Sequence, residues 1–194
     1  MYYETCGARV LGMGGTIPGT NTPIVVSNDT GEPVTGPTPA ELAQQAVDQM
    51  DLEGPDIQIA PDPTGTGTVG VPVWMWTAES PTTTGPSTAS ASAGGITVTA
   101  IATAQSIEWS MGDGTSVTCE PPGTAYEASM GMAMSPDCGH KYGLPSANQP
   151  GGTYSVSGTT TWRVPWEGGG ESGVILTTRT SSTELTIGQL NVLN

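Results

Sequence analysis

The sequence predicts a mainly β protein: an antiparallel β-sandwich preceded by an N-terminal segment that contains one α-helix. The composition is the first indication, because 28 glycines, 17 prolines and abundant threonine and serine favour strands and turns over helices. The second is that short segments of alternating apolar and polar residues recur between turn signals, as they do in sandwiches. The third is that one segment alone has the apolar period of a helix.

That helical segment spans residues 38–51. Thr38 is a favourable N-cap, Pro39 suits the first helical position, and Glu41 completes a capping box. Its apolar residues fall on one face: Leu42, Ala43, Ala46, Val47 and Met50. Gly54 and Pro55 should end the helix. We interpret it as a helix that packs on a sheet edge or a domain junction, with a partner-binding helix as the alternative.

A strong strand is expected at residues 71–77. Val71, Val73 and Met75 alternate with Trp74 and Trp76, so both faces are apolar and should both be covered. The N-terminal segment and the helix are the expected cover for one face. The alternative is a groove in which the tryptophans bind a ligand.

The Thr/Pro-rich stretch at residues 80–86 is the expected domain boundary. It divides an N-terminal segment, residues 1–80, from a sandwich domain, residues 86–194. Strands are expected in this second part at residues 87–93, 96–101, 106–111, 116–119, 153–164 and 173–187. In the third of these, Trp109 shares a face with Ile107 and Met111, so it should lie in the core between two sheets.

Charge excludes several classes of function. The chain has 18 acidic and 4 basic residues, a net charge of −14, and its few cations are scattered, so nucleic-acid binding is not expected. No apolar run is long enough to span a membrane. Three cysteines in an acidic, lysine-poor chain indicate an oxidising compartment, so we expect a secreted or cell-surface protein. The first 20 residues show no signal peptide, and we therefore expect a mature or truncated form, or a misplaced start.

Three motifs occur in order along the second half of the chain. They are Trp109-x-x-Gly112-Asp113-Gly114, then His140-x-Tyr142, then Gly152-x-Tyr154 followed by Val156. This pattern resembles the PKD domain over residues 86–187. The resemblance implies an immunoglobulin-like sandwich that acts as a spacer or contacts proteins or carbohydrates, without catalytic activity. Met111 stands where the family has phenylalanine, and residues 115–139 form a longer segment than the family's.

The whole chain also resembles secreted actinomycete proteins that carry an "ATP/GTP-binding" label. A nucleotide-binding P-loop needs Gly-Lys-Ser/Thr, but the only lysine, Lys141, is followed by Tyr142. We therefore expect no nucleotide site.

The motif residues have structural roles in this interpretation. Gly112 and Gly114 allow backbone angles that other residues avoid, and Asp113 should cap its own turn. His140 and Tyr142 should lie at the same corner and hydrogen-bond to the backbone. A metal site of Asp113, Asp137 and His140, or calcium at Asp113, is the alternative. Because the spacing fits no standard metal motif, we expect neither metal nor cofactor.

Cys119 and Cys138 are expected to form a disulfide that closes a loop containing Met130, Met132 and Met134. Cys6 is then the odd cysteine, either free or paired with a residue upstream of the recorded start.

Catalytic readings find little support. His140 is the only histidine, and no Gly-x-Ser-x-Gly elbow presents a nucleophile to it. Several carboxylates are available for glycoside hydrolysis, and we interpret them as solvated acidic loops: Glu108, Glu120, Glu127, Glu167 and Glu171.

Trp162 and Trp166 alternate with Val164 next to Gly168–Gly170, a pattern that predicts a hairpin tip with one apolar face. If buried, the two tryptophans are core, and if exposed, they can stack a sugar or seat a partner. The sequence thus predicts a non-catalytic structural or interaction module that mediates protein contacts outside the cell. Binding of carbohydrate or cell wall through Trp162 and Trp166 is the alternative.

Overall fold

The computed structural model describes residues 36–189, and the structural statements below concern these residues. The odd cysteine, Cys6, lies outside them. The described chain is mainly β, as predicted, with two sheets in a sandwich-like arrangement. None of its helices has the length and hydrophobicity that crossing a bilayer requires.

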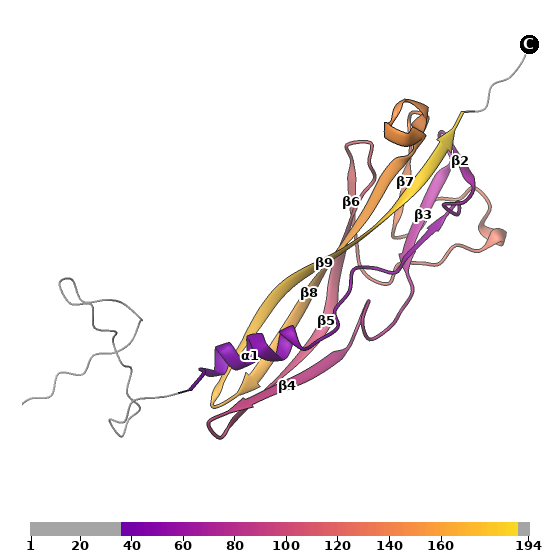
Figure 1. Cartoon of the computed structure of the whole chain (residues 1–194). Helices are drawn as coiled ribbons and strands as arrows, with labels where there is room; N and C mark the ends of the chain where they lie inside the picture. Colours follow the sequence, from indigo (N-terminus) through magenta and orange to yellow (C-terminus); the bar gives the residue numbers. More distant parts are fainter. Residues whose placement is uncertain (1–35, 190–194) are drawn as a thin grey trace, which may run out of the picture. The chain divides into compact units, whose positions relative to one another are not determined.

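One α-helix, nine strands and three short 3₁₀ helices form within these residues (Figure 1). In chain order they are α1 (Pro39–Asp48), β1 (Ile57–Ala60), β2 (Thr66–Thr68), β3 (Pro72–Thr77), β4 (Ser87–Ala93), β5 (Ile96–Ser110), β6 (Ser116–Cys119), η1 (Ala128–Met130), β7 (Gly139–Lys141), η2 (Ser146–Asn148), η3 (Pro150–Gly152), β8 (Tyr154–Gly168) and β9 (Glu171–Gly188).

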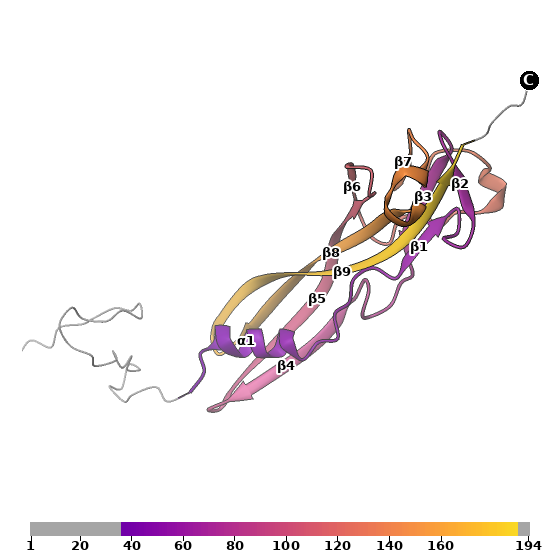
Figure 2. The ribbon, with the colours of Figure 1, turned by 45° about the horizontal axis from the view of Figure 1, so that its top comes forward.

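The larger sheet has six strands in the order β2-β9-β8-β5-β4, with β6 also paired to β5. The smaller sheet has the order β1-β3-β7. All pairs are antiparallel except β2 and β9, which run parallel. The long strands β5, β8 and β9 run side by side through the whole larger sheet (Figures 1 and 2).

Strand β5 joins two segments that the sequence suggested were separate strands, residues 96–101 and 106–111. The pairing of β5 with β8 shifts register between Ala104 and Ser106. Such a bulge adds one residue to one strand. The buried residues therefore change from even to odd positions while they stay on one face of the sheet: Val98, Ala100, Ala102, Ala104, Ile107 and Trp109.

Helix α1 begins as predicted, with a complete capping box between Thr38 and Glu41. It ends at Asp48, with Gln49 as C-cap, and is therefore shorter than the expected span of residues 38–51. The chain then leaves the helical path, and the side chains of Met50 and Leu52 are buried in the same core cluster as the helix. The helix thus ends before the Gly54-Pro55 signal, and these two residues are packed in the core without helical structure.

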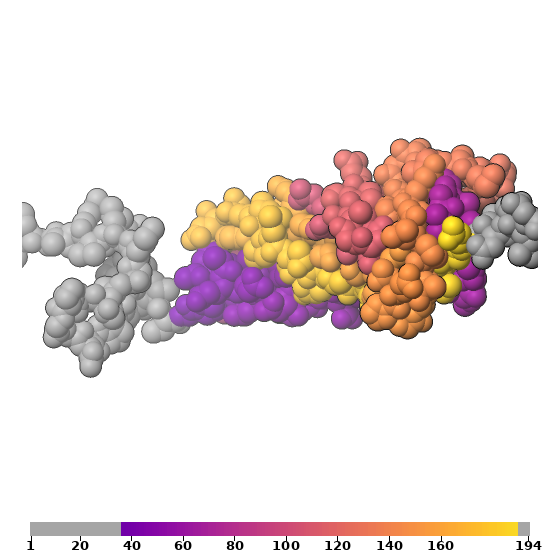
Figure 3. All heavy atoms as spheres, turned by 90° about the horizontal axis from the view of Figure 1, so that it is seen from above, coloured from indigo at the N-terminus to yellow at the C-terminus, as the bar shows by residue number. Residues whose placement is uncertain are grey.

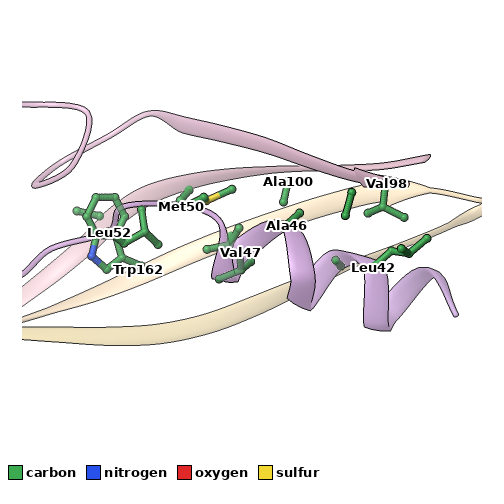
Figure 4. Close-up of a cluster of buried hydrophobic side chains, with 13 residues drawn as sticks. Leu42, Ala46, Val47, Met50, Leu52, Val98, Ala100 and Trp162 are labelled. Carbon is green, nitrogen blue, oxygen red and sulfur yellow. The ribbon is translucent and has the colours of Figure 1, made fainter. Parts of the chain in front are cut away.

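The first of two core clusters lies between α1 and one end of the larger sheet (Figure 4). Leu42, Ala46 and Val47 of the helix pack on Val98, Ala100 and other residues of β5 and β8. The space-filling view shows α1, in indigo, lying against the yellow atoms of β9 (Figure 3). Trp162 is buried in this cluster and donates a hydrogen bond from Nε1 to the carbonyl oxygen of Glu53, 3.0 Å away.

The second cluster lies between the two sheets at the other end of β5, β8 and β9. Trp109 is fully buried in it, as the sequence predicted, together with Val73 and Met75 of β3 and with Tyr142 and Tyr154. The helix does not cover β3, contrary to expectation, because it packs in the first cluster. The outward face of β3 is covered instead by the loop that the two cysteines close.

Residues 38–80 do not form a separate segment. Residues 38–189 form one compact unit, in which β3 pairs with β7 and β2 pairs with β9. The stretch at residues 80–86 is therefore a turn within that unit, and the domain boundary expected there was wrong. Strands from before this turn complete both sheets, a long-range pairing that no local composition shift reveals.

Helix α1 and the smaller sheet both lie on one face of the larger sheet, because the buried residues of β8 share one parity from Tyr154 to Val164. The opposite face is exposed and rich in hydroxyls. Side-chain hydroxyl pairs bridge its strands at Ser90–Thr99, Ser92–Thr97 and Thr159–Thr180, with oxygen separations of 2.9, 2.8 and 2.9 Å.

Candidate functional site

Most of the motif residues gather at one corner, where β5 turns into β6 beside β7. Asp113 caps this turn as predicted: its Oδ1 accepts hydrogen bonds from the backbone N of Thr115 at 3.0 Å and from the Thr115 hydroxyl at 2.6 Å. Gly112 has φ +76°, and a Cβ there would stand 2.6 Å from the carbonyl oxygen of Ser155. Only glycine fits both the angle and this close approach.

His140 lies on β7. We expected it to hydrogen-bond to the backbone, but it bonds to a side chain instead. Its Nε2 lies 2.8 Å from Oδ2 of Asp113, and both side chains are mostly buried. The two residues are 27 positions apart, and the pairing of β7 with β3 is what brings His140 to the corner. The imidazole also meets the ring of Tyr142 edge-on, with 4.6 Å between ring centroids.

The tyrosines of the motif connect the corner to the core. Tyr142 donates from its hydroxyl to the carbonyl oxygen of Met111 at 2.8 Å, as predicted, and its ring stacks on Tyr154 with centroids 4.4 Å apart. Burial, and then the negative charge of Asp113, raise the pKa of the Tyr142 hydroxyl above its ordinary value. Tyr142 therefore stays protonated and serves as a hydrogen-bond donor.

Gly152 lies in η3 beside a buried serine that the sequence did not single out. The Ser146 hydroxyl donates to the carbonyl oxygen of Gly152 at 2.6 Å and accepts from the backbone N of Ile187 at 2.9 Å. It thus fastens this turn to the end of β9. A serine in a Pro/Asn-rich loop gives no local signal of such a role.

The electrostatics of the corner favour an ionised Asp113. Partial burial opposes the charge, but the hydrogen bonds from Thr115 and His140 outweigh burial and lower the pKa of the carboxyl below its usual value. Asp137 does not join this pair. Its oxygens accept from Thr124 and from the Ser135 hydroxyl, at distances of 2.8 to 3.2 Å.

The metal alternative finds no support in the described part of the chain. Residues 36–189 contain no cluster of three or more His, Cys, Asp or Glu side chains arranged to hold a metal. Within these residues the His140 imidazole has one hydrogen-bond partner, Asp113. The contact between the two side chains joins the turn after β5 to β7.

The predicted disulfide is confirmed: Cys119 and Cys138 are joined, 19 positions apart. It holds the base of a loop that crosses the outward face of β3. Trp74 anchors this loop by donating from Nε1 to the carbonyl oxygen of Ala133 at 2.8 Å and by meeting the ring of Tyr126 edge-on. Because Trp74 is only 3% exposed, it lies under the loop and is not open to a ligand.

An apolar groove opens between this loop and the β2–β3 region. Its volume is about 430 Å³. The residues that give it its apolar character are Ala60, Pro61, Val71, Pro72, Tyr126 and Met132. None of the lining residues is charged, and Met132 is 77% exposed. The sequence showed methionines in this loop but did not predict the groove, because its walls come from segments far apart in the chain.

A second, larger hollow is polar. It lies between the 53–57 segment, the 80–83 turn and β9, with a volume of about 760 Å³. Its charged groups already have partners in the protein. The Arg179 guanidinium donates to the carbonyl oxygens of Leu52 and Thr178, and the Thr82 hydroxyl donates to Glu53. These contacts bind neighbouring segments of the chain together.

The two tryptophans suggested for ligand binding, Trp162 and Trp166, differ in their exposure to solvent. Trp162 is completely buried, so it cannot stack a sugar, and its place in the middle of β8 is not a hairpin tip. The tip is at Gly168–Gly170. Trp166, beside it, is partly buried and packs against the first core cluster.

Comparison with known proteins finds no matching family model, no matching curated protein and no matching solved structure.

Proposed function

We propose that this chain is a non-catalytic structural and interaction module, with a PKD-like sandwich, that contacts a protein partner at the cell surface or in a secreted assembly. The observation that carries the proposal is the uncharged, apolar groove beside the disulfide-tied loop. Exposed apolar surface of this kind marks binding sites in soluble proteins.

The side chains with reactive chemistry support a non-catalytic role. Asp113 bonds to His140 and to Thr115, and Tyr142 donates to the carbonyl oxygen of Met111. These contacts join the end of β5 to β7. Cys119 and Cys138 are consumed in the disulfide. A bond of this kind persists in oxidising compartments, which favours an extracellular location.

The lining of the groove indicates an apolar peptide segment as the occupant. Pro61, Pro72 and Tyr126 offer rigid apolar walls, and Met132 is a flexible side chain that can adapt to different partners. The chain carries a net charge of −14, so basic or neutral residues beside that segment would be favoured over acidic ones.

Selection of displayed random peptides on the full chain tests this proposal. We expect enrichment of apolar peptides that no longer bind Met132→Glu, because the substitution places a charge in the groove. Leu144→Glu is the matched control: Leu144 is 71% exposed but lies outside the groove, so binding should persist. Failure to enrich any peptide, or peptides that bind Met132→Glu equally well, would reject the groove as the contact surface.

Glycan binding remains as a second candidate through Trp166 alone, because this ring is partly exposed at the hairpin tip. Retention of the protein on chitin or peptidoglycan, lost in Trp166→Ala, is the expected result for this candidate. Absence of retention by the wild-type chain would remove it.

A further inference from the structure

Strand β4 ends the larger sheet with an unpaired edge. It pairs with β5 along one side through all seven residues, Ser87 to Ala93. Within residues 36–189 no strand pairs with its other side, and Figures 1 and 2 both show it as the outermost strand. Such an edge presents backbone N–H and C=O groups that can pair with a further strand.

The devices that usually protect a sheet edge are missing from β4. Its sequence, Ser-Thr-Ala-Ser-Ala-Ser-Ala, contains no charge and no proline, and its register with β5 has no bulge. The edges elsewhere differ. β9 carries Glu171, Arg179 and Glu184, while β1, β2, β6 and β7 have no more than four residues each. β4 is thus the long, uncharged edge of the described chain.

The charge of the protein limits where a second copy can approach. Two chains of net charge −14 repel each other, and the repulsion is least where neither presents charged groups. Residues 81–107, which include β4 and most of β5, contain no Asp, Glu, Lys, Arg or His. The free edge therefore coincides with the longest uncharged stretch of an acidic chain.

The strand is also nearly complementary to itself. In an antiparallel pair related by a two-fold axis at Ser90, Ser90 faces its counterpart, Ala89 faces Ala91, and Thr88 faces Ser92. In this register the hydroxyl side chains face hydroxyl side chains of the other copy, and the alanine methyl groups face alanine methyl groups. The same kind of pairing already holds β4 to β5, where the Ser90 hydroxyl lies 2.9 Å from that of Thr99.

The strand is ordered before it meets a partner. Ala91 is buried against the first core cluster, and Ala89 and Ala93 pack on that cluster, which includes Leu42 and Ala46 of α1. Thr88, Ser90 and Ser92 point to the exposed face. A strand held in this way loses little further conformational entropy when a second strand adds to it.

We propose that two copies of this chain associate through their β4 strands, antiparallel about Ser90, to form one sheet that continues through both molecules. The inference goes beyond the proposed function and does not rest on it, because no residue of β4 lines the apolar groove. The occupant of the edge is a second copy of the same chain.

Sedimentation velocity of the full chain over about three decades of concentration tests this pairing. We expect a monomer–dimer equilibrium that strengthens with added salt, which screens the repulsion between acidic chains. Ser90→Glu should weaken the dimer by roughly tenfold or more, because like charges then face each other across the axis. Ser90→Lys should do the same, and an equal mixture of the two variants should restore association.

Thr178→Glu is the matched control, since Thr178 is an exposed residue of β9 away from the β4 edge and should leave the dimer unchanged. A wild-type chain that stays monomeric at every concentration would overturn the proposal. So would a dimer that Ser90→Glu leaves intact.

Crosslinking provides a second measurement that is independent of affinity. Residues directly opposite in an antiparallel pair have Cα separations of about 4.5 to 5.5 Å, within the range that a disulfide spans. On a Cys6→Ser background, Ser90→Cys should form a covalent dimer under mild oxidation, while Thr178→Cys should not. Equal crosslinking of the two variants would contradict β4 pairing.

Discussion

Two tryptophan side chains are completely buried, one in each core cluster, and they differ in one hydrogen bond. Trp162 donates its indole N–H to the carbonyl oxygen of Glu53, whereas the Nε1 of Trp109 has no hydrogen-bond partner among residues 36–189. An unsatisfied buried donor costs about 1–3 kcal/mol, so Trp109 contributes to stability through packing alone. The sequence predicted burial for Trp109. Whether each indole N–H finds an acceptor, however, depends on which backbone segment lies opposite it in the fold.

This difference predicts unequal effects of one substitution. Trp109→Phe removes the unsatisfied donor along with some apolar contact, while Trp162→Phe also leaves the Glu53 carbonyl without its partner. We expect Trp162→Phe to lower the free energy of unfolding by about 1 kcal/mol more than Trp109→Phe does. Urea denaturation of both variants gives the comparison, and a larger loss in Trp109→Phe would contradict the assignment.

Asp113 makes the stability of the corner depend on pH. Because folding lowers the pKa of its carboxyl from the usual 3.8, the ionised form stabilises the folded state above that pH. The stabilisation is lost as the pH falls through the lowered value. We therefore expect Asp113→Asn to be less stable than wild type near neutral pH, with a difference that shrinks below about pH 4.

Asp62 provides the matched comparison for this prediction. It caps a turn in the same way, accepting from the backbone N and the hydroxyl of Thr64, but it has no histidine partner. Urea denaturation of both Asn variants over this pH range should show a larger loss for Asp113→Asn. Equal losses would mean that His140 adds nothing to the turn cap.

At the scale of elements, the strands and the start of α1 were predictable because they depend on local patterns. Alternation placed Ile107 and Trp109 of β5 in the core, and the capping box placed Thr38 at the start of the helix. The continuity of β5 was not predictable, because a bulge changes the phase of the alternation and so looks like the end of a strand. The contacts of His140 and Trp74 depend on pairings between distant segments, which a single sequence does not encode locally.

The pairing of β5 with β8 gives Gly158 a packing role. It lies opposite Trp109, and a Cβ there would stand 2.6 Å from Cγ of Pro55 and 3.1 Å from the Trp109 ring. We expect Gly158→Ala to lower the free energy of unfolding by about 1–3 kcal/mol through overpacking. Gly143→Ala, where a Cβ has open space, is the control and should change thermal stability little. A tolerated Gly158→Ala would show that the segment around Pro55 can move aside.

At the scale of the molecule, residues 38–85 are part of the fold and not an attachment to it. They supply α1 to the first core cluster and β1 and β3 to the second. The sequence pointed to a boundary at residues 80–86 because a Thr/Pro-rich turn resembles a linker. Composition alone does not distinguish a turn inside a unit from a connection between units.

Two truncations test this view. A chain of residues 38–194 should unfold cooperatively in urea, because it retains the whole compact unit. A chain of residues 86–194, the sandwich that the sequence suggested, should not, because it exposes the apolar faces that α1 and β3 cover. Far-UV circular dichroism during denaturation distinguishes the two. Cooperative unfolding of the shorter chain with unchanged midpoint would restore the predicted boundary.

The arrangement of α1 and β9 has a mechanical consequence. The start of α1 lies beside the β8–β9 hairpin tip, where a Cβ on Gly169 would come within 2.9 Å of Pro39, whereas β9 runs from that tip to Gly188 at the far end of the sheet. Tension between residues 38 and 188 would pull β9 along its own axis. Since the hydrogen bonds to β8 lie across the strands, this load shears them all together and does not peel them one by one. A chain inserted between two anchored neighbours through these ends would resist extension. Single-molecule pulling between residues 38 and 188 should therefore need more force than pulling between residues 95 and 169.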